Sequence, residues 1–119
     1  MSFERCKSQT NYSKRVCKEF SHHIGENEEI IENFEGHGII PRSSDKALLT
    51  EDSVIIFEDG FLSKGVEDIP LSKISSTKAD RTLLGGCSEF KSSTSQKSIC
   101  GLFNKTEAKE FTHQIRNSI

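Results

Sequence analysis

Residues Ala47 to Gly60 have the sequence ALLTEDSVIIFEDG, which predicts two β-strands joined by a tight polar turn. Short hydroxyl and carboxylate side chains, such as those from Thr50 to Ser53, hydrogen-bond to their own backbone and favour turns. The β-branched and aromatic run from Val54 to Phe57 is too short for a helix and ends at Asp59-Gly60. Such an apolar run suits a strand that is covered on both faces, near the middle of a small barrel or sandwich.

The chain has 119 residues, which is the size of one domain. Hydrophobic residues make up 33% and charged residues 29%, as in a small and well-solvated globule. The net charge of -2 gives no general attraction to nucleic acid or to anionic lipid. No apolar run approaches the roughly 20 residues of a membrane helix, and Met1 to Lys7 has no apolar signal core. We therefore expect a cytoplasmic protein that binds no nucleic acid.

The four cysteines are Cys6, Cys17, Cys87 and Cys100, and no pair has the close CxxC spacing of a zinc knuckle or a redox site. Disulfides are rare in the cytoplasm, and free cysteines are often buried as small apolar groups. The sequence therefore predicts four reduced thiols.

The first 25 residues predict helical structure. One stripe of such a helix would carry Phe3, Cys6, Thr10, Ser13, Cys17, Phe20 and Ile24. Because Thr10 and Ser13 weaken this stripe, a second interpretation breaks it at Asn11 and leaves a firm helix only from about Tyr12 to His23. Gly25 ends the helix in both interpretations. The stripe suits either a coiled-coil seam or packing on the chain's own domain.

From Glu29 onward the sequence predicts about seven short strands and then a helix. Asn104 is a good N-cap, and Glu107 follows it by three residues, so the two form a capping box. One face of this helix then carries Ala108, Phe111, Ile115 and Ile119. We therefore divide the chain into an N-terminal helical segment, residues 1–25, and an α+β domain, residues 26–119.

Short motifs follow one another along this second domain. They are ENEE at residues 26–29, LLTEDSVIIF at 48–57, IPLSKI at 69–74, LLG at 83–85 and NKTEAKEF at 104–111. In order and spacing they resemble the E-G-E-E, L-x-L-T-x-x-R-L-I-F, I-P-L-x-K-I, G-L-L-x-G and closing-helix motifs of the pleckstrin-homology (PH)-like domains of bacteria and their phages. The resemblance covers about Glu29 to Ile119 and also includes the preceding ENEE stretch at residues 26–29. Ser53 replaces the family's usual basic residue, and the N-terminal segment has no counterpart in the minimal domain.

The resemblance implies a PH-like seven-stranded β-barrel or sandwich closed by a C-terminal α-helix, with an additional N-terminal helix. It also implies a binding module without known catalytic machinery, and it supplies no ligand.

The residues themselves support no enzyme, metal site or cofactor. The sequence has no Gly-rich phosphate loop, no HExxH and no GxSxG. His22 and His23 follow Cys17 at helical spacing, but neighbours in a helix point about 100° apart and cannot both face one metal with Cys17. Nothing in the sequence fixes a contact between His37 and Cys87 or Cys100 that would activate a thiol.

Binding to a phospholipid headgroup is disfavoured by charge. Eukaryotic lipid-binding members of the PH family present several basic residues from their first strands, whereas the first strand predicted here carries Glu29, Glu32 and Glu35. Clustered carboxylates repel an anionic headgroup. We therefore expect no stable membrane binding.

Two hypotheses for a partner remain. In the first, the module binds another protein or assembles into a homo-oligomer, since PH-like barrels have an open sheet edge and a groove beside the last helix. Leu83 and Leu84, at a predicted hairpin tip, are the contact point in this hypothesis, unless one of them folds under the barrel rim.

In the second hypothesis, a small anionic ligand of the nucleotide type is bound or sequestered in a pocket between subunits. Basic side chains would hold it there, namely Arg42, Lys46, Lys78 and Arg81. This hypothesis rests on analogy with ring-forming PH-like domains rather than on a motif.

Overall fold

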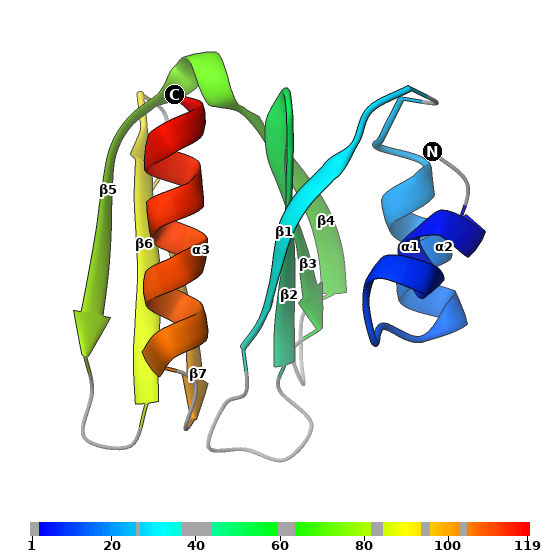
Figure 1. The fold of residues 1–119 in the computed structure, drawn as a ribbon, viewed down its shortest axis with the longest axis horizontal. Coiled ribbons are helices and arrows are strands. Elements are labelled where there is room, and N and C mark those ends of the chain that lie inside the picture. Colours follow the sequence, from blue (N-terminus) through cyan, green and yellow to red (C-terminus); the bar gives the residue numbers. More distant parts are fainter. Residues whose placement is uncertain are drawn as a thin grey trace.

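The computed structural model describes residues 3–25, 27–36, 44–59, 64–81, 85–93, 96–102 and 105–119. Within these residues the chain forms three α-helices, seven strands and one short 3-10 helix (Figure 1). In chain order they are α1 (Phe3–Gln9), α2 (Lys14–Ser21), β1 (Ile30–Glu35), β2 (Ser44–Thr50), β3 (Ser53–Asp59), β4 (Lys64–Pro70), η1 (Leu71–Lys73), β5 (Ile74–Arg81), β6 (Gly85–Ser92), β7 (Gln96–Leu102) and α3 (Lys105–Ser118). The predicted N-cap of α3, Asn104, lies outside the described residues.

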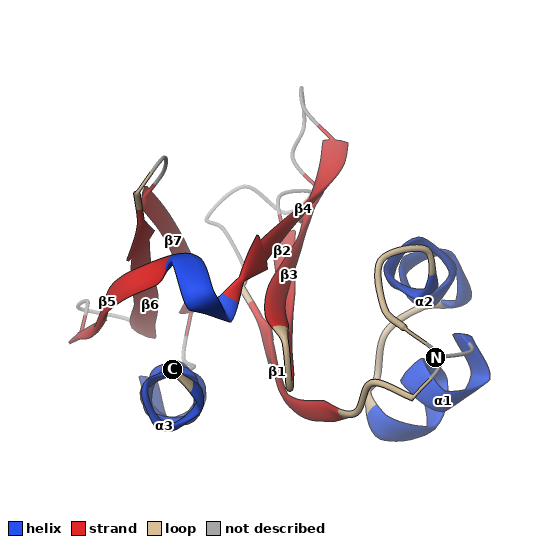
Figure 2. Ribbon diagram, turned by 90° about the horizontal axis from the view of Figure 1, so that it is seen from above, coloured by secondary structure: helices blue, strands red, loops and turns tan. Residues whose placement is uncertain are grey.

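The strands form two antiparallel sheets, with the orders β1-β2-β3-β4 and β5-β6-β7. Figure 2 shows α3 at the opening between the two sheets. The helix packs mainly against β5 and β6 of one sheet and β1 of the other. The seven strands and the C-terminal helix are as predicted. A closed barrel is not formed, because the hydrogen-bonded ladders of the described strands end at the edges of two separate sheets.

The hairpin predicted from Ala47 to Gly60 is present as β2 and β3, which pair Leu49 with Val54 and Leu48 with Ile55. The Thr50 hydroxyl accepts the Ser53 N–H at 3.1 Å and donates to the Ser53 carbonyl oxygen at 3.2 Å. This local bonding fixes the turn between the strands. The residues from Val54 to Phe57 are all buried, so β3 is covered on both faces as the sequence predicts.

One face of the first sheet points toward the second sheet and α3. The side chains buried there, which we call the inner cluster, are those of Phe34, Ala47, Leu49, Val54, Ile56, Ile69, Leu71, Ile74, Phe90, Ile99, Ala108, Phe111 and Ile115. The rings of Phe34 and Phe111 lie 5.8 Å apart between centroids, which joins β1 to α3. Thr112 donates a hydrogen bond of 2.6 Å to the Ser88 hydroxyl and so joins α3 to β6.

The opposite face of the first sheet is covered by α1 and α2. The outer cluster consists of Cys6, Tyr12, Val16, Cys17, Phe20, Ile24, Leu48, Ile55 and Phe57. Alternation along a strand explains why Ile56 belongs to the inner cluster and Ile55 to the outer one. Figure 2 places these helices and α3 on opposite sides of the sheet.

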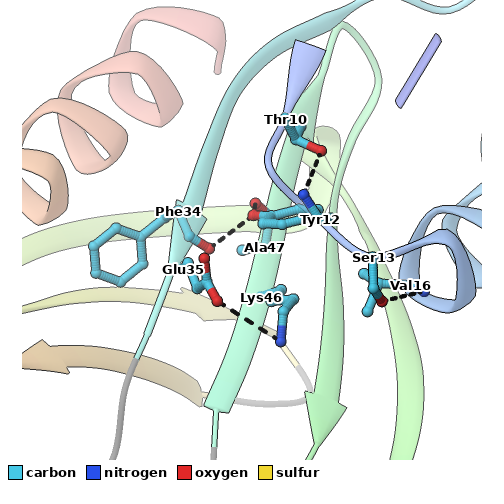
Figure 3. Close-up of polar contacts among 8 residues, drawn as sticks. All are labelled: Thr10, Tyr12, Ser13, Val16, Phe34, Glu35, Lys46 and Ala47. Atoms are coloured by element: carbon cyan, nitrogen blue, oxygen red, sulfur yellow. Dashed lines mark hydrogen bonds and ion pairs between the residues drawn. The ribbon is translucent and has the colours of Figure 1, made fainter. Parts of the chain in front are cut away.

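Tyr12 links the N-terminal segment to β1 and β2 by hydrogen bonds. Its hydroxyl lies 3.2 Å from the carbonyl oxygens of both Phe34 and Ala47, which are partners in the β1–β2 ladder (Figure 3). One phenolic proton is shared between the two acceptors. Burial raises the pKa of Tyr12 well above its ordinary value, and the nearby Glu35 carboxylate adds to this shift.

The continuous helix predicted from Phe3 to Ile24 is interrupted. The chain leaves helical structure from Thr10 to Ser13, and the Ser13 hydroxyl then caps α2 by accepting the Val16 N–H at 3.3 Å. The helix α2 ends at Ser21, four residues before Gly25. Because the apolar stripe packs on β2 and β3, the structure favours packing on the chain's own domain over a coiled-coil seam.

The prediction of four reduced thiols is wrong. Disulfides join Cys6 to Cys17 and Cys87 to Cys100. Neither pair can be recognised from its sequence separation alone. The reversal of the chain between α1 and α2 brings Cys6 and Cys17 together, and Cys87 and Cys100 are register partners in the β6–β7 hairpin. Stable disulfides are rare in the cytoplasm, so the cytoplasmic location stays an expectation.

Candidate functional site

A groove of about 470 Å³ lies between β5 and α3. We call it the β5–α3 groove, and its lining residues are Thr77, Lys78, Ala79, Lys109, Glu110, Thr112, His113 and Arg116. Among the described strands, β5 pairs with β6 alone, so one side of β5 faces away from its sheet. The groove therefore runs beside a sheet edge.

The apolar core fixes which side of α3 faces this groove. Ala108, Phe111 and Ile115 are buried in the inner cluster and set the rotation of the helix. Three exposed basic side chains follow at helical spacing on the adjoining stripe, namely Lys109, His113 and Arg116. Residues at positions i, i+4 and i+7 lie above one another on a helix, so these three line one wall of the groove.

Positive charge predominates along the groove. Lys78, Lys109 and Arg116 carry fixed positive charges, and among the described residues of the lining Glu110 is the one carboxylate. Asp80 lies just outside the lining of the groove, with its carboxylate 3.3 Å from the Lys78 ammonium. Because the Lys78 side chain is 68% exposed, water screens this ion pair and a carboxylate of a ligand can compete with Asp80. The groove favours an anionic ligand.

The edge strand β5 gives this groove a second property. Its residues from Ser75 to Arg81 are exposed or half-buried. A strand at the edge of a sheet presents backbone N–H and C=O groups to which another strand can add. A β-bulge between Ile74 and Ser76 marks the start of the regular β5–β6 ladder. The wall opposite α3 can therefore supply backbone hydrogen bonds as well as side chains.

Comparison with known proteins agrees with this architecture. The family model described as Bacterial PH domain matches residues 24–117. The chain belongs to the bacterial PH domain family. No curated protein matches it. Domains with this fold are in general non-catalytic binding modules, and the helices α1 and α2 both precede the part of this bacterial PH domain that the family model matches.

A second cleft of the bacterial PH domain, of about 410 Å³, lies between α2 and the strands β3 and β4. Its lining residues are Arg15, Glu19, His23, Phe57, Gly65 and Val66. The Arg15 guanidinium lies 5.7 Å from the centre of the Phe57 ring, within the range of a cation–π contact. Arg15 and Glu19 oppose each other in charge, so this cleft has no preference for an anion.

The sequence-predicted binding residues lie in different places. Lys78 lines the β5–α3 groove, and Arg81 is exposed at the end of the same strand. Lys46 lies in the other sheet, where its side chain is 11% exposed and its ammonium is 4.0 Å from the Glu35 carboxylate (Figure 3). Lys78 and Arg81 share β5, but three positions along a strand place them on opposite faces, and Lys46 lies on the other sheet, so the structure does not gather these residues into one site. Arg42, Leu83 and Leu84 lie outside the described residues.

Sequence reasoning missed the contribution of α3. The predicted apolar face of this helix is confirmed for Ala108, Phe111 and Ile115, but not for Ile119, which follows the end of α3 and is 52% exposed. The same periodicity applied to Lys109, His113 and Arg116 gives the basic stripe. Which strand faces that stripe depends on the packing of α3 across the sheets, which no local pattern encodes.

The described residues contain no cluster of His, Cys, Asp or Glu side chains that is suited to hold a metal ion. Cys17, considered above with His22 and His23, is bonded to Cys6. Among the described helices, none is long and apolar enough to cross a membrane.

Proposed function

We propose that this bacterial PH domain is a non-catalytic protein-binding module that takes an extended acidic segment of a partner along β5, in the β5–α3 groove. The observation that carries the proposal is the combination of an edge strand with a basic helix stripe in a single groove. Either feature alone is common on protein surfaces, whereas together they specify both the conformation and the charge of a ligand.

Strand addition supplies affinity through backbone hydrogen bonds and specificity through alternate side chains. Side chains at every second position of an added strand point to the same face of the sheet. Acidic residues at these positions would face Lys109 and Arg116 on α3, while the residues between them would lie on the outer face of the sheet. We therefore expect a partner segment with alternating acidic and β-branched residues.

A small anionic ligand is the alternative occupant, because the same basic side chains would attract it. The set proposed from the sequence loses support as a single site, since Lys46 is paired with Glu35 on the other sheet. A nucleotide-type anion would have to bind through Lys78 and the α3 stripe. Self-association by strand addition is compatible with the protein-binding proposal.

Fluorescence anisotropy with synthetic peptides tests the proposal. An alternating Glu–Val peptide of about ten residues, enough to span a strand, should bind, and an alternating Lys–Val peptide of equal length should not. Methylation of the peptide nitrogens on one edge should abolish binding of the Glu–Val peptide, because it removes backbone donors and keeps the charge. Equal binding of the methylated and unmodified peptides would exclude strand addition.

Charge-reversal variants locate the binding. Arg116→Glu should lower the affinity for the Glu–Val peptide by about tenfold or more, because it replaces an attraction by a repulsion. Lys18→Glu is the matched control, since Lys18 is an exposed residue on α2 and the net charge changes equally. If both variants weaken binding to the same degree, the groove is not the site. Displacement of the peptide by equimolar ATP would favour the small-anion alternative.

A further inference from the structure

The Cys87–Cys100 disulfide lies on the face of the second sheet that points away from α3. Its two residues are register partners in the β6–β7 ladder. Their neighbours Ser88 and Ile99 point inward, since Ser88 accepts a hydrogen bond from Thr112 on α3 and Ile99 belongs to the inner cluster. Because successive side chains of a strand point to opposite faces, both sulfur atoms lie on the outer face of this sheet.

The hairpin that carries this disulfide is also held together by other bonds. The ladder between β6 and β7 runs from the pair Gly85–Leu102 to the pair Lys91–Gln96, so it continues on both sides of the cysteines. The residue that follows the first cysteine and the residue that precedes the second are anchored on the inner face, as described above. The two sulfur atoms therefore stay close together when the bond between them is broken, and the two thiols can form the same bond again.

The sulfur atoms of the chain differ in their access to solvent. Cys100 is exposed, and the Ser98 hydroxyl lies 3.7 Å from its sulfur at the surface, whereas Cys87 is 6% exposed. In the other disulfide, Cys6 and Cys17 are both 0% exposed. The rate of thiol–disulfide exchange depends on which sulfur a thiolate can reach. A dissolved thiolate reaches Cys100 in the folded protein, and it reaches the other three sulfur atoms only after local opening.

We propose that the Cys87–Cys100 pair is a reversible redox site at which Cys100 exchanges with a small monothiol. The thiolate of the monothiol attacks the Cys100 sulfur and forms a mixed disulfide with it. The bond to Cys87 breaks, and its electron pair leaves with the Cys87 sulfur, which takes a proton from water. A second monothiol then attacks the first one in the mixed disulfide and releases Cys100 as a thiol. In total, two monothiols become one disulfide, and the protein disulfide becomes two thiols.

Reaction of the oxidised full chain with reduced glutathione tests this site. The chain has trypsin sites between each cysteine and the next, so after alkylation and digestion each cysteine falls in a peptide of its own. Mass spectrometry should find glutathione on Cys100 and not on Cys87. The Cys87–Cys100 bond should be lost at least about ten times faster than the Cys6–Cys17 bond, because the buried pair reacts only after local opening.

Two single variants identify the reactive sulfur. In Cys87→Ser, Cys100 has no resolving thiol, so treatment with oxidised glutathione should give a stable mixed disulfide at Cys100. In Cys100→Ser the remaining thiol, that of Cys87, is buried and should react at least about ten times more slowly. The circular-dichroism spectrum of the wild-type protein should stay the same when the Cys87–Cys100 bond is reduced, because the ladder and the inner cluster hold the hairpin.

Three results would overturn the proposal. One is glutathione on Cys87 rather than on Cys100, or equal reaction rates of the two variants. Another is reduction of Cys6–Cys17 as fast as that of Cys87–Cys100. The third is a loss of sheet signal when the Cys87–Cys100 bond alone is reduced. If either variant does not fold, the position of glutathione in the wild-type protein and the order in which its two disulfides are reduced carry the test.

Discussion

The two apolar faces of the sheet β1-β2-β3-β4 are buried in different ways. The inner cluster draws on both sheets and α3, so its members come from residues 34 to 115. The outer cluster joins alternate residues of β2 and β3 to two short helices that precede the family match. The inner cluster thus holds together the family fold, and the outer cluster attaches an addition to it.

This difference shows how a domain can gain an element without changing its core. Leu48 and Ile55 are buried by the N-terminal helices, while their neighbours Leu49 and Val54 serve the inner cluster. Strand alternation keeps the two sets apart. Substitutions in the inner cluster should therefore unfold the whole domain, and those in the outer cluster should loosen the N-terminal segment first.

The largest effect is expected for Phe111→Ala. Phe111 is 0% exposed in the inner cluster and contacts Phe34 across the opening between the sheets. Truncation of a buried phenylalanine lowers the free energy of unfolding by about 3–5 kcal/mol. Urea denaturation followed by circular dichroism measures this loss. A change below about 1 kcal/mol, the scale of an average substitution, would show that Phe111 is not part of the core.

Gly36→Ala should have the second largest effect on stability, because Gly36, at the end of β1, lies against β7. A Cβ atom at Gly36 would lie 2.6 Å from the Cys100 carbonyl oxygen and 2.8 Å from Ile99 Cγ2. Backbone must shift to admit it, at a cost of about 1–3 kcal/mol. Gly65→Ala is the matched control, since nothing lies within 4 Å of its added Cβ. Equal stability of the two variants would contradict the close approach of β1 and β7.

Tyr12→Phe tests the outer cluster alone. The substitution removes the hydroxyl that bonds to the Phe34 and Ala47 carbonyl oxygens and keeps the ring. Loss of a buried hydrogen-bond donor costs about 1–3 kcal/mol. Hydrogen exchange should show faster opening of α2, with exchange in β6 and β7 unchanged. Uniformly faster exchange in all strands would mean that the two clusters unfold as one unit.

The smallest effect is expected for Lys97→Met. Lys97 on β7 lies 2.7 Å from Glu67 and 3.1 Å from Glu58 and so links the two sheets. Its hydrogen bonds with Glu67 and Glu58 raise the pKa of Lys97 above the ordinary lysine value. The wild-type advantage, about 1 kcal/mol or less for a partly exposed pair, is complete at neutral pH and disappears as the pH rises through this raised pKa. Thermal unfolding of both proteins at neutral and strongly alkaline pH measures it.

Local patterns were enough to predict the hairpin around Thr50, the burial of β3 on both faces and the apolar face of α3. Each of these depends on residues close together in the sequence. The contacts that were missed join distant residues: Cys6 with Cys17, Cys87 with Cys100, and the stripe of Lys109 with the edge of β5. A turn between two helices, or the register of a hairpin, brings such residues together, and neither follows from residue spacing alone.

Tyr12 also gives the protein a natural spectroscopic probe. It is the single tyrosine of a chain without tryptophan, so the near-ultraviolet signal of tyrosine comes from one position in the outer cluster. In the folded protein the Tyr12 phenol stays protonated at pH values well above the ordinary pKa of tyrosine. When the N-terminal segment opens, the exposed phenol ionises near pH 10, as a free tyrosine does. An alkaline pH jump followed by phenolate absorbance would therefore record, in unlabelled protein, how often the outer face of the sheet becomes uncovered.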